Sequence, residues 1–491
     1  MNNNSRSAAP LRVLIIGAGF AGIGLAIKLR QAGIEDFLIL EKADEVGGCW
    51  RENHYPGAAC DVPSHLYSYS FEPNPHWSRK FAPQAEIFAY LRHCADKYGI
   101  RPFIRFGREV SEARFDAASG QWQVRDAEGE TYQAQALISA TGQLSRPQYP
   151  RLPGLETFAG PAFHSAHWRD DLDLRGKRVA VIGTGASAIQ FVPQIAPQVE
   201  HLSLFQRSAA YVLPKPDRAY ADWERRLKAR FPLLQRLDRA IQYVHHESRL
   251  LGFAVVPALM KLMRLRTAYH LRRGIADGDL RKRLQPDYPM GCKRILISND
   301  YYPALRRDNV AVVNTPIREV VANGIVTTDG HLHEVDALIY GTGFAATDFL
   351  APMAITGLDG RELNAAWREG AQAYKGISVS GFPNLFILYG PNTNLGHNSI
   401  VYMLESQFPY VMACLQRLQS DDLRYLDVKA PVQQAYDQHV QQALRHTVWE
   451  KGCDSWYKTA AGRNTNNWPG FTFRYRQQTR APEFADYDLV R

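Results

Sequence analysis

The chain has 491 residues, of which 45% are hydrophobic and 22% are charged. This length exceeds what a single hydrophobic core usually supports, so two or more domains are expected. The composition excludes a disordered chain and a fibrous repeat. The net charge of +9 comes from one segment, residues 225–283, which holds fifteen Lys and Arg against four Asp and Glu. Because the rest of the chain is slightly acidic, the charge does not indicate a nucleic-acid partner.

The basic segment has three interpretations. A solvated helical face is favoured, a groove that attracts an anionic cofactor comes second, and a membrane surface comes third. No integral membrane segment is expected, because the longest apolar stretch, residues 250–263, is interrupted by Gly252, Pro257 and Lys261 and is too short to cross a bilayer. The N-terminal residues are interpreted as a short tail before a strand rather than as a signal peptide.

The six cysteines are scattered without a Cys-x-x-Cys pair, at Cys49, Cys60, Cys94, Cys292, Cys414 and Cys453. This spacing predicts neither a metal site nor a redox dithiol. Reduced thiols in a cytoplasmic protein are therefore the preferred expectation.

The first nucleotide-binding signal lies near the N-terminus, where an apolar strand runs into a glycine-rich turn. In a Rossmann turn the first glycine permits the bend, the second lets backbone approach a pyrophosphate, and the third lets the helix pack on the strand. Gly17, Gly19 and Gly22 fill these positions, and a helix is predicted over residues 21–32. Glu41 ends the next strand, nineteen residues after Gly22, where a carboxylate would accept hydrogen bonds from a ribose diol. These features predict an FAD site.

A second strand, turn and helix follow more than 160 positions later, with Gly183, Gly185 and Ala188 in the three glycine positions and Ser187 in the turn. Alanine is an allowed replacement for the third glycine. Arg207 stands nineteen residues after Ala188, where an acidic residue would bind a ribose diol. A cation there matches a ribose 2′-phosphate, so this site is predicted to bind NADPH rather than NADH. FAD together with NADPH is typical of enzymes that reduce a flavin by hydride transfer.

The predicted fold class is α/β, with two Rossmann-like dinucleotide-binding domains and an inserted helical subdomain. Three prolines within residues 145–154 break both helix and strand, which places a domain linker there. The Arg-rich stretch that begins near residue 217 has a helical pattern and no strand signal. The expected bounds are 1–147 and 346–491 for the FAD-binding domain, 148–216 and 290–345 for the NADP-binding domain, and 217–289 for the helical insertion.

A Phe-x-Gly-x-x-x-His-x-x-x-Trp signature lies just after the linker, formed by Phe158, Gly160, His164 and Trp168. With two further motifs it makes the chain resemble the class B flavin monooxygenases and, within them, the type I Baeyer-Villiger monooxygenases. The family usually continues with Pro or Asp directly after the tryptophan, whereas Arg169 intervenes here.

The two further motifs lie on either side of this signature. The stretch from Gly47 to Asp61, which includes Gly48 and Trp50, is similar to a second Baeyer-Villiger fingerprint at every defined position and is the more specific match. Residues 291–302, with Lys293 and Arg294 near their start, look like the family segment that carries the active-site arginine and a cofactor-binding lysine. The resemblance covers nearly the whole chain.

The resemblance implies conversion of a ketone to an ester or lactone with FAD, NADPH and O₂, through a peroxyflavin. It implies that Arg294 is the catalytic arginine, with Asp61 as its carboxylate partner, and that Lys293 and Arg207 hold the 2′-phosphate. A guanidinium suits this role because it stays cationic and offers a rigid fork of donors to developing negative charge. Gly48 and Trp50 would then contact the flavin cofactor, and His164 and Trp168 would shape the hinge between domains.

Each of these residues has a simpler explanation: Asp61 as a turn residue, Arg294 as a surface cation, His164 as a core histidine. Taken alone, His164 is better explained that way, whereas the matched motifs favour a functional role for Asp61 and Arg294. The nearest alternative activity is an N- or S-oxygenating flavin monooxygenase, and a non-catalytic redox sensor is a more distant one. The lack of Cys-x-x-Cys excludes a disulfide reductase. The sequence leaves the ketone and the oligomeric state open.

Overall fold

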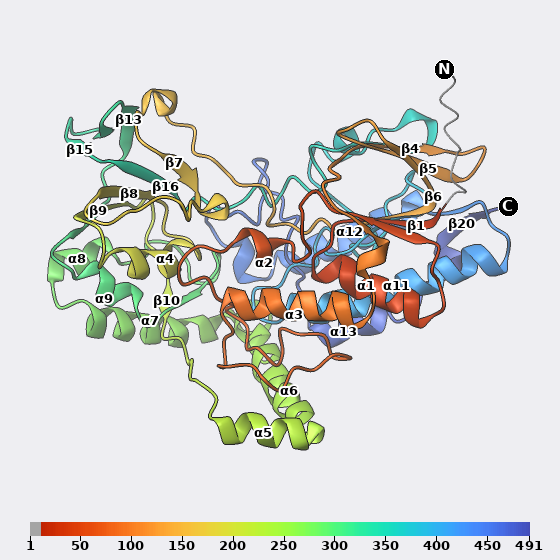
Figure 1. Ribbon diagram of the computed structural model, residues 1–491, viewed down its shortest axis with the longest axis horizontal. Coiled ribbons are helices and arrows are strands. Elements are labelled where there is room, and N and C mark those ends of the chain that lie inside the picture. The colour runs from red at the N-terminus through yellow and green to blue at the C-terminus, as the bar shows by residue number, and fades with distance from the viewer. Residues whose placement is uncertain (1–10) are drawn as a thin grey trace.

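The structure, a computed structural model, describes residues 11–491 and contains two separate β-sheets with helices packed against them (Figure 1). The larger sheet has the strand order β17-β4-β5-β6-β1-β2-β3, and β18 also pairs with β6. Its strands are β1 (Leu11–Ile16), β2 (Phe37–Leu40), β3 (Ile104–Arg105), β4 (Val110–Asp116), β5 (Gln121–Asp126), β6 (Thr131–Ser139), β17 (Ala354–Thr356) and β18 (Leu385–Ile387).

Strand β1 lies inside the parallel part of this sheet, between β2 and β6. Its apolar residues from Val13 to Ile15 have no exposed surface, as expected for a parallel strand that is covered on both faces. Helix α1 (Phe20–Gln31) follows it, so the predicted helix is confirmed to within one residue at each end. Helix α11 (Ile400–Ser420) packs closely on α1, because a Cβ on Gly24 would lie 2.6 Å from the Phe408 ring.

Strands β4, β5 and β6 form an antiparallel meander that the sequence analysis did not predict. Buried Ala113 and Phe115 alternate with exposed neighbours in β4, which is the pattern of a sheet covered on one face. The C-terminal part of the chain returns to the same sheet, because Leu385 of β18 pairs with Leu137 of β6.

The second sheet is entirely parallel, with the order β12-β9-β8-β16-β7. Its strands are β7 (Ala162–His164), β8 (Arg178–Ile182), β9 (His201–Phe205), β12 (Val310–Val313) and β16 (Ala337–Tyr340). Helices α4 (Ala188–Ile195) and α9 (Tyr301–Leu305) pack together beside it. A small antiparallel sheet adds β13 (Ile317–Val321), β14 (Gly324–Thr327) and β15 (Leu332–Glu334). The α/β fold class with two Rossmann-like sheets is confirmed, while the exact domain bounds stay a prediction.

A helical segment lies between β10 (Val212–Leu213) and β11 (Leu296–Ile297), which pair in parallel. It consists of α5 (Asp222–Arg230), α6 (Pro232–Glu247), the π-helical turn η4 (Leu251–Val255), the 3₁₀ turn η5 (Pro257–Leu259), α7 (Met260–Gly274) and α8 (Gly278–Arg283). The prediction of a helical, strand-free segment is confirmed. Most basic side chains of this segment are exposed, so the favoured interpretation of a solvated helical face stays a prediction, and α6 exposes a row of apolar side chains beside them.

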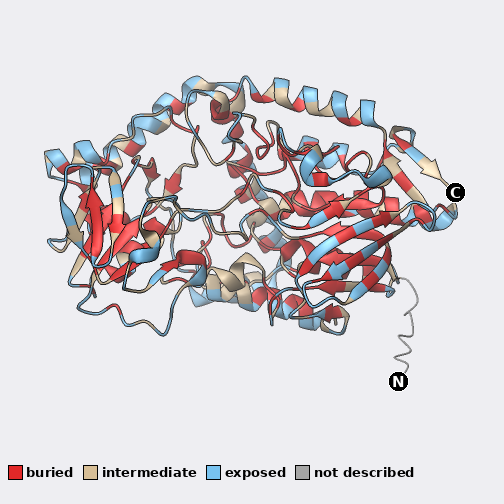
Figure 2. Cartoon of the chain, turned by 90° about the horizontal axis from the view of Figure 1, so that it is seen from above, coloured by how far each residue is buried: buried red, intermediate tan, exposed pale blue. Residues whose placement is uncertain are grey.

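The remaining helices and strands surround the two sheets. They are α2 (Cys49–Glu52), α3 (Gln84–Lys97), α10 (Leu363–Ala366), α12 (Ala430–Leu444) and α13 (Thr472–Gln478), with an antiparallel pair of β19 (Tyr425–Val428) and β20 (Tyr487–Val490). Short 3₁₀ turns complete the fold: η1 (Arg101–Phe103), η2 (Leu155–Thr157), η3 (Ser165–His167), η6 (Leu358–Gly360), η7 (Val448–Glu450) and η8 (Phe484–Asp486). Figure 2 shows the buried residues concentrated in the strands of the two sheets. Across residues 11–491, no helix combines the length and apolar character needed to cross a membrane.

Candidate active site

The first glycine-rich turn leaves the start of α1 open to a ligand. Gly17 has φ +103°, and a Cβ there would lie 2.8 Å from the Ala140 carbonyl oxygen, so only glycine fits this bend. A Cβ on Gly22 would overlap the Gly17 carbonyl oxygen at 1.9 Å, which explains the third glycine. Gly19 caps α1, where the first-turn amides and the positive end of the helix dipole suit a phosphate.

The Glu41 carboxylate is buried against this turn at the end of β2. It accepts hydrogen bonds from the backbone N–H groups of Ala18 at 2.7 Å and Ala43 at 3.0 Å. Glu41 therefore fixes the shape of the glycine-rich turn, and its two oxygens keep lone pairs for further donors such as a ribose diol.

The fingerprint loop from Gly47 to Asp61 joins the two nucleotide sites. On the first side, the Gly47 N–H donates to the Ala18 carbonyl at 2.9 Å, and a Cβ on Gly48 would lie only 3.2 Å from the Gly19 Cα. On the second side, Gln190 of α4 accepts from the Tyr55 hydroxyl at 2.9 Å and donates to the Ala59 carbonyl at 2.9 Å. The loop thus fixes one turn relative to the other.

Trp50 belongs to the same loop and lies in helix α2. Its indole N–H donates to the Tyr67 hydroxyl at 3.1 Å, and its carbonyl accepts from the Gln84 side chain. The first bond orients the ring and the second holds the backbone of α2, next to the contact between Gly48 and Gly19.

The second glycine-rich turn repeats the geometry of the first. Gly183 has φ +108°, and a Cβ there would lie 2.4 Å from the Gly341 carbonyl oxygen. Around Gly185 the space is open, since the nearest atom to a Cβ there lies 3.8 Å away. Ser187 is the N-cap residue of α4, and its side chain makes no capping bond. The helix start is therefore available to a second pyrophosphate.

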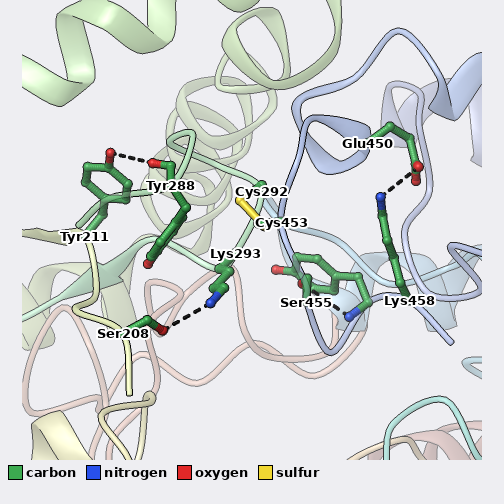
Figure 3. Close-up of a disulfide and its surroundings, with 10 residues drawn as sticks. Ser208, Tyr211, Tyr288, Cys292, Lys293, Glu450, Cys453, Ser455 and Lys458 are labelled. Carbon is green, nitrogen blue, oxygen red and sulfur yellow. Dashed lines mark hydrogen bonds and ion pairs between the residues drawn. A yellow bond between two sulfur atoms is a disulfide. The ribbon is translucent and has the colours of Figure 1, made fainter. Parts of the chain in front are cut away.

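Arg207 and Lys293 converge beside this turn although 86 positions of sequence separate them. The Lys293 ammonium donates to the Ser208 hydroxyl at 3.1 Å and lies 4.6 Å from the centre of the Tyr288 ring (Figure 3). Burial and then repulsion from Arg207 lower the pKa of Lys293. Neither Arg207 nor Lys293 forms an ion pair among the described residues. Together with the Ser208 hydroxyl, these two cations form a fitting site for a ribose 2′-phosphate.

Arg294 and Asp61 form the central ion pair, with 233 positions between them. The Nε of Arg294 donates to Asp61 Oδ2 at 2.9 Å, and Nη2 donates to the same oxygen. Burial raises the pKa of Asp61, but the charge and hydrogen bonds of Arg294 outweigh it and leave that pKa lowered. The attraction of Asp61 raises the pKa of Arg294. The pair is therefore ionised, and the third nitrogen of the guanidinium, Nη1, has no hydrogen-bond partner within residues 11–491.

Both side chains of this pair are partly exposed, Arg294 at 29% and Asp61 at 35%, so a ligand can reach them. Tyr389, Tyr457 and Lys215 lie close enough to interact electrostatically with the pair. The region around this pair, which the fingerprint loop connects to both glycine-rich turns, is the candidate active site.

The Phe158–Trp168 signature lies at the junction of the two sheets rather than at the ion pair. A Cβ on Gly160 would lie 2.5 Å from the Asp336 carbonyl oxygen and 2.8 Å from the Phe158 ring, so glycine is required for this packing. The Trp168 ring packs on Phe191 of α4, with ring centres 5.4 Å apart.

His164 lies within the same signature and has no exposed surface. Its Nδ1 accepts from the Ala166 N–H at 3.1 Å, and burial lowers its pKa to about 4. The ring contacts Tyr149 and Phe344, one from each of the two segments that link the sheets. This placement supports a role in the hinge and none in catalysis.

A disulfide between Cys292 and Cys453 lies beside the site (Figure 3). The expectation of reduced thiols is wrong for these two cysteines, while Cys49, Cys60, Cys94 and Cys414 are free. Spacing rules detect only local pairs, and this bond joins residues 161 positions apart. It ties the loop that carries Lys293 and Arg294 to the C-terminal segment that carries Tyr457.

We expect Cys453→Ser to lower the melting temperature by about 5 °C, because a bond that closes so long a loop typically contributes roughly 2–5 kcal/mol. Reductant should lower the melting temperature of the unmodified chain to the same value and leave that of the variant unchanged. Thermal unfolding with and without dithiothreitol measures this. Equal melting temperatures of both proteins in oxidising buffer would show that the bond does not stabilise the fold.

Two nucleotide turns, joined by a loop that carries one member of a partly buried Arg–Asp pair, define a pyridine-nucleotide-dependent flavoprotein. A family profile described as pyridine nucleotide-disulphide oxidoreductase matches residues 14–230. The chain is 50% identical over 502 residues to a Baeyer-Villiger monooxygenase of Pseudomonas aeruginosa, covering 100% of this chain and 95% of that relative. It is 45% identical over 483 residues to a Baeyer-Villiger monooxygenase of Streptomyces coelicolor, covering 98% and 93%.

Solved structures agree with these relatives. An oxidized steroid monooxygenase bound to NADP is similar with a TM-score of 0.88 and 32% identity, covering 98% of this chain and 100% of that one. A cyclohexanone monooxygenase from Rhodococcus sp. Phi1 bound to NADP⁺ is similar with a TM-score of 0.89 and 28% identity, covering 98% and 100%. The chain belongs to the Baeyer-Villiger monooxygenase family. Membership of this family confirms the predicted FAD- and NADPH-dependent monooxygenase activity.

Sequence reasoning did not identify several residues that border the site. Ser208 directly follows Arg207 in the sequence, and this adjacency was the signal that could have identified its hydroxyl as a further hydrogen-bond donor to a phosphate. Tyr389 has φ +63°, a strained conformation for a tyrosine that is frequent at functional sites, but strain leaves no sequence pattern. Gln190 and Tyr457 reach the site only through tertiary packing.

Proposed function

We propose that this chain inserts one oxygen atom next to the carbonyl of a ketone, with Arg294 as the catalytic residue and Asp61 as its positioning residue. The observation that supports this most is the arrangement of the pair. Because Nε and Nη2 both donate to one oxygen of Asp61, the guanidinium is fixed while Nη1 remains available. Bound FAD, once reduced by NADPH, supplies the activation of O₂.

Arg294 acts on the substrate oxygen. When a nucleophile attacks a ketone, negative charge develops on the carbonyl oxygen, and a fixed cationic donor stabilises that charge more than it stabilises the neutral ketone. Nη1 is the donor in a position to do so. An arginine suits the task because its pKa, raised further here, prevents proton loss at any working pH.

Asp61 acts through Arg294. Its carboxylate orients the guanidinium and balances its charge, since an unpaired cation would be costly to hold in a site surrounded by protein. Lys215 adds positive charge nearby, and burial lowers the pKa of its ammonium.

Arg207, Ser208 and Lys293 bind the 2′-phosphate in this proposal, and the turns at Gly17–Gly22 and Gly183–Ala188 hold the two pyrophosphates. Glu41 serves the ribose of FAD. We also propose a cytoplasmic location. Cytoplasmic reductants would then act on the Cys292–Cys453 disulfide and reduce it.

The test is a panel of ketones incubated with the purified protein, FAD, NADPH and O₂, with products separated and identified. An amine and a thioether belong in the same panel. Ester or lactone formation coupled to NADPH consumption is expected. Oxidation of the amine or thioether without ester from any ketone would replace this proposal with an N- or S-oxygenase.

A further inference from the structure

Helix α6 is oriented with its polar side inward. Its buried residues are Gln235, Gln242, His246 and Glu247. Its apolar residues face solvent, with Leu233 at 75%, Leu237 at 57%, Ile241 at 61% and Val244 at 63% exposed. Spacings of four and three residues place these four side chains on one face of the helix. A helix at an ordinary protein surface has the opposite orientation.

Specific contacts hold α6 in this orientation. The Arg239 guanidinium donates to the carbonyls of His65 at 2.6 Å and Ser68 at 2.9 Å. At the other end of the helix, Glu247 accepts from the Asn398 side chain at 2.6 Å and from the Thr472 hydroxyl at 2.8 Å. Rotating the helix to bury its leucines would break these bonds and expose a buried polar network, so the apolar face is a fixed feature of the surface.

The apolar face continues onto the neighbouring helices. Trp223 of α5 is 63% exposed, Phe231 between α5 and α6 is 52% exposed, and Leu262 and Leu265 of α7 are 62% and 67% exposed. We call the exposed apolar residues of α5, α6 and α7, together with Phe231, the insert surface. Figure 1 shows α5 and the adjoining end of α6 projecting below the body of the molecule. An apolar surface of this extent normally contacts a partner.

The charges around the insert surface indicate which partner. Arg226, Arg230, Arg236, Arg264 and Arg266 are exposed and make no ion pair within the described residues. Apolar side chains flanked by unpaired cations match an anionic bilayer, whose headgroups receive the arginines and whose acyl boundary receives the apolar groups. A second copy of the chain fits less well, because a symmetric contact would bring like charges together.

We propose that the insert surface docks on the surface of a membrane containing anionic lipids, with α5, α6 and α7 lying in the interface without crossing it. This goes beyond the oxygenation chemistry and does not depend on it. Since His246 on the inner side of α6 lies close enough to Asp61 to interact electrostatically, docking would bring apolar ketones in the membrane close to the active site.

The test is sedimentation of the FAD-loaded full chain with vesicles of phosphatidylcholine, with and without phosphatidylglycerol. We expect binding to the anionic vesicles, and at least about 10-fold weaker binding for Leu237→Gln/Ile241→Gln and for Arg226→Gln/Arg230→Gln. Leu332→Gln is the matched control, because Leu332 is an exposed leucine of β15 far from these helices in sequence, and it should bind as the unmodified chain does. Flavin absorbance and NADPH oxidation of each variant verify folding.

Three results would overturn the proposal. The unmodified chain could stay in the supernatant with anionic vesicles, or it could bind neutral vesicles as tightly as anionic ones. Light scattering could instead show a dimer that Leu237→Gln/Ile241→Gln dissociates, which would assign the insert surface to contact between copies. None of these results requires turnover, so they are independent of the outcome of the ketone panel.

Discussion

Arg294→Ala is expected to lower ester formation by a factor of 10² or more while the protein still folds and binds FAD. Removing one donor to a developing oxyanion typically costs about 10²–10³ in rate. The loss should exceed that of an ordinary donor because Nη1 belongs to a cation fixed by two bonds to Asp61. The measurement is ester and H₂O₂ yield per NADPH consumed, with a ketone that the unmodified enzyme accepts.

NADPH oxidation should persist in Arg294→Ala and end in H₂O₂, since the arginine acts on the ketone. Arg294→Lys keeps a charge but loses the fork of donors, so it should recover only a small part of the ester yield. Arg318→Ala, at an exposed arginine of β13, controls for loss of a positive charge. An ester yield near that of the unmodified enzyme in Arg294→Ala would remove this residue from the mechanism.

Asp61→Ala should give a milder loss of ester yield than Arg294→Ala, because Asp61 acts through Arg294 by orienting the guanidinium and balancing its charge. Without the carboxylate, Arg294 keeps its charge but is free to rotate away from the substrate. The ester yield of Asp61→Asn should lie between those of Asp61→Ala and the unmodified enzyme, since an amide oxygen still accepts a hydrogen bond but carries no charge.

The two nucleotide turns were predictable because each rests on local rules. Gly17 and Gly183 need positive φ, and the acid or cation at the end of the next strand follows at a fixed spacing. The Arg294–Asp61 pair could not be predicted from local rules of this type. No periodicity connects residues 233 positions apart, and only the resemblance to a family brought them together.

Other features lay outside the reach of pattern reasoning. Helical spacing shows that α6 has an apolar face but not which way that face points, because tertiary contacts such as those of Arg239 decide it. The Cys292–Cys453 bond likewise depends on the fold that brings two distant segments together. By contrast, strands β4 to β6 show the alternation of a sheet with one exposed face, as in β5, where buried Trp122 and Val124 alternate with exposed Gln123 and Arg125, so this meander was within reach of the sequence.

Arg207→Ala is expected to weaken NADPH binding by roughly 10- to 100-fold and to leave NADH binding nearly unchanged. A hydrogen bond to a charged group contributes about 1.5–3 kcal/mol, which corresponds to one to two decades in affinity. Only NADPH presents the 2′-phosphate that Arg207 and Lys293 are proposed to bind. The repulsion that lowers the pKa of Lys293 in the free protein is relieved when a phosphate lies between the two cations. Rapid-mixing measurements of flavin reduction against the concentration of each coenzyme give both affinities.

Lys293→Ala should shift the preference in the same direction, and Ser208→Ala by less, because a hydroxyl is a neutral donor. Arg175→Ala is the matched control, since Arg175 is an exposed arginine that precedes β8 and pairs with Asp173 away from the turn. An equal loss for NADPH and NADH in Arg207→Ala would assign this arginine to the common part of the coenzyme or to the fold. Unchanged affinities for both coenzymes would place the 2′-phosphate elsewhere and leave Lys293 and Ser208 as a structural contact between the loop before β11 and the loop after β9.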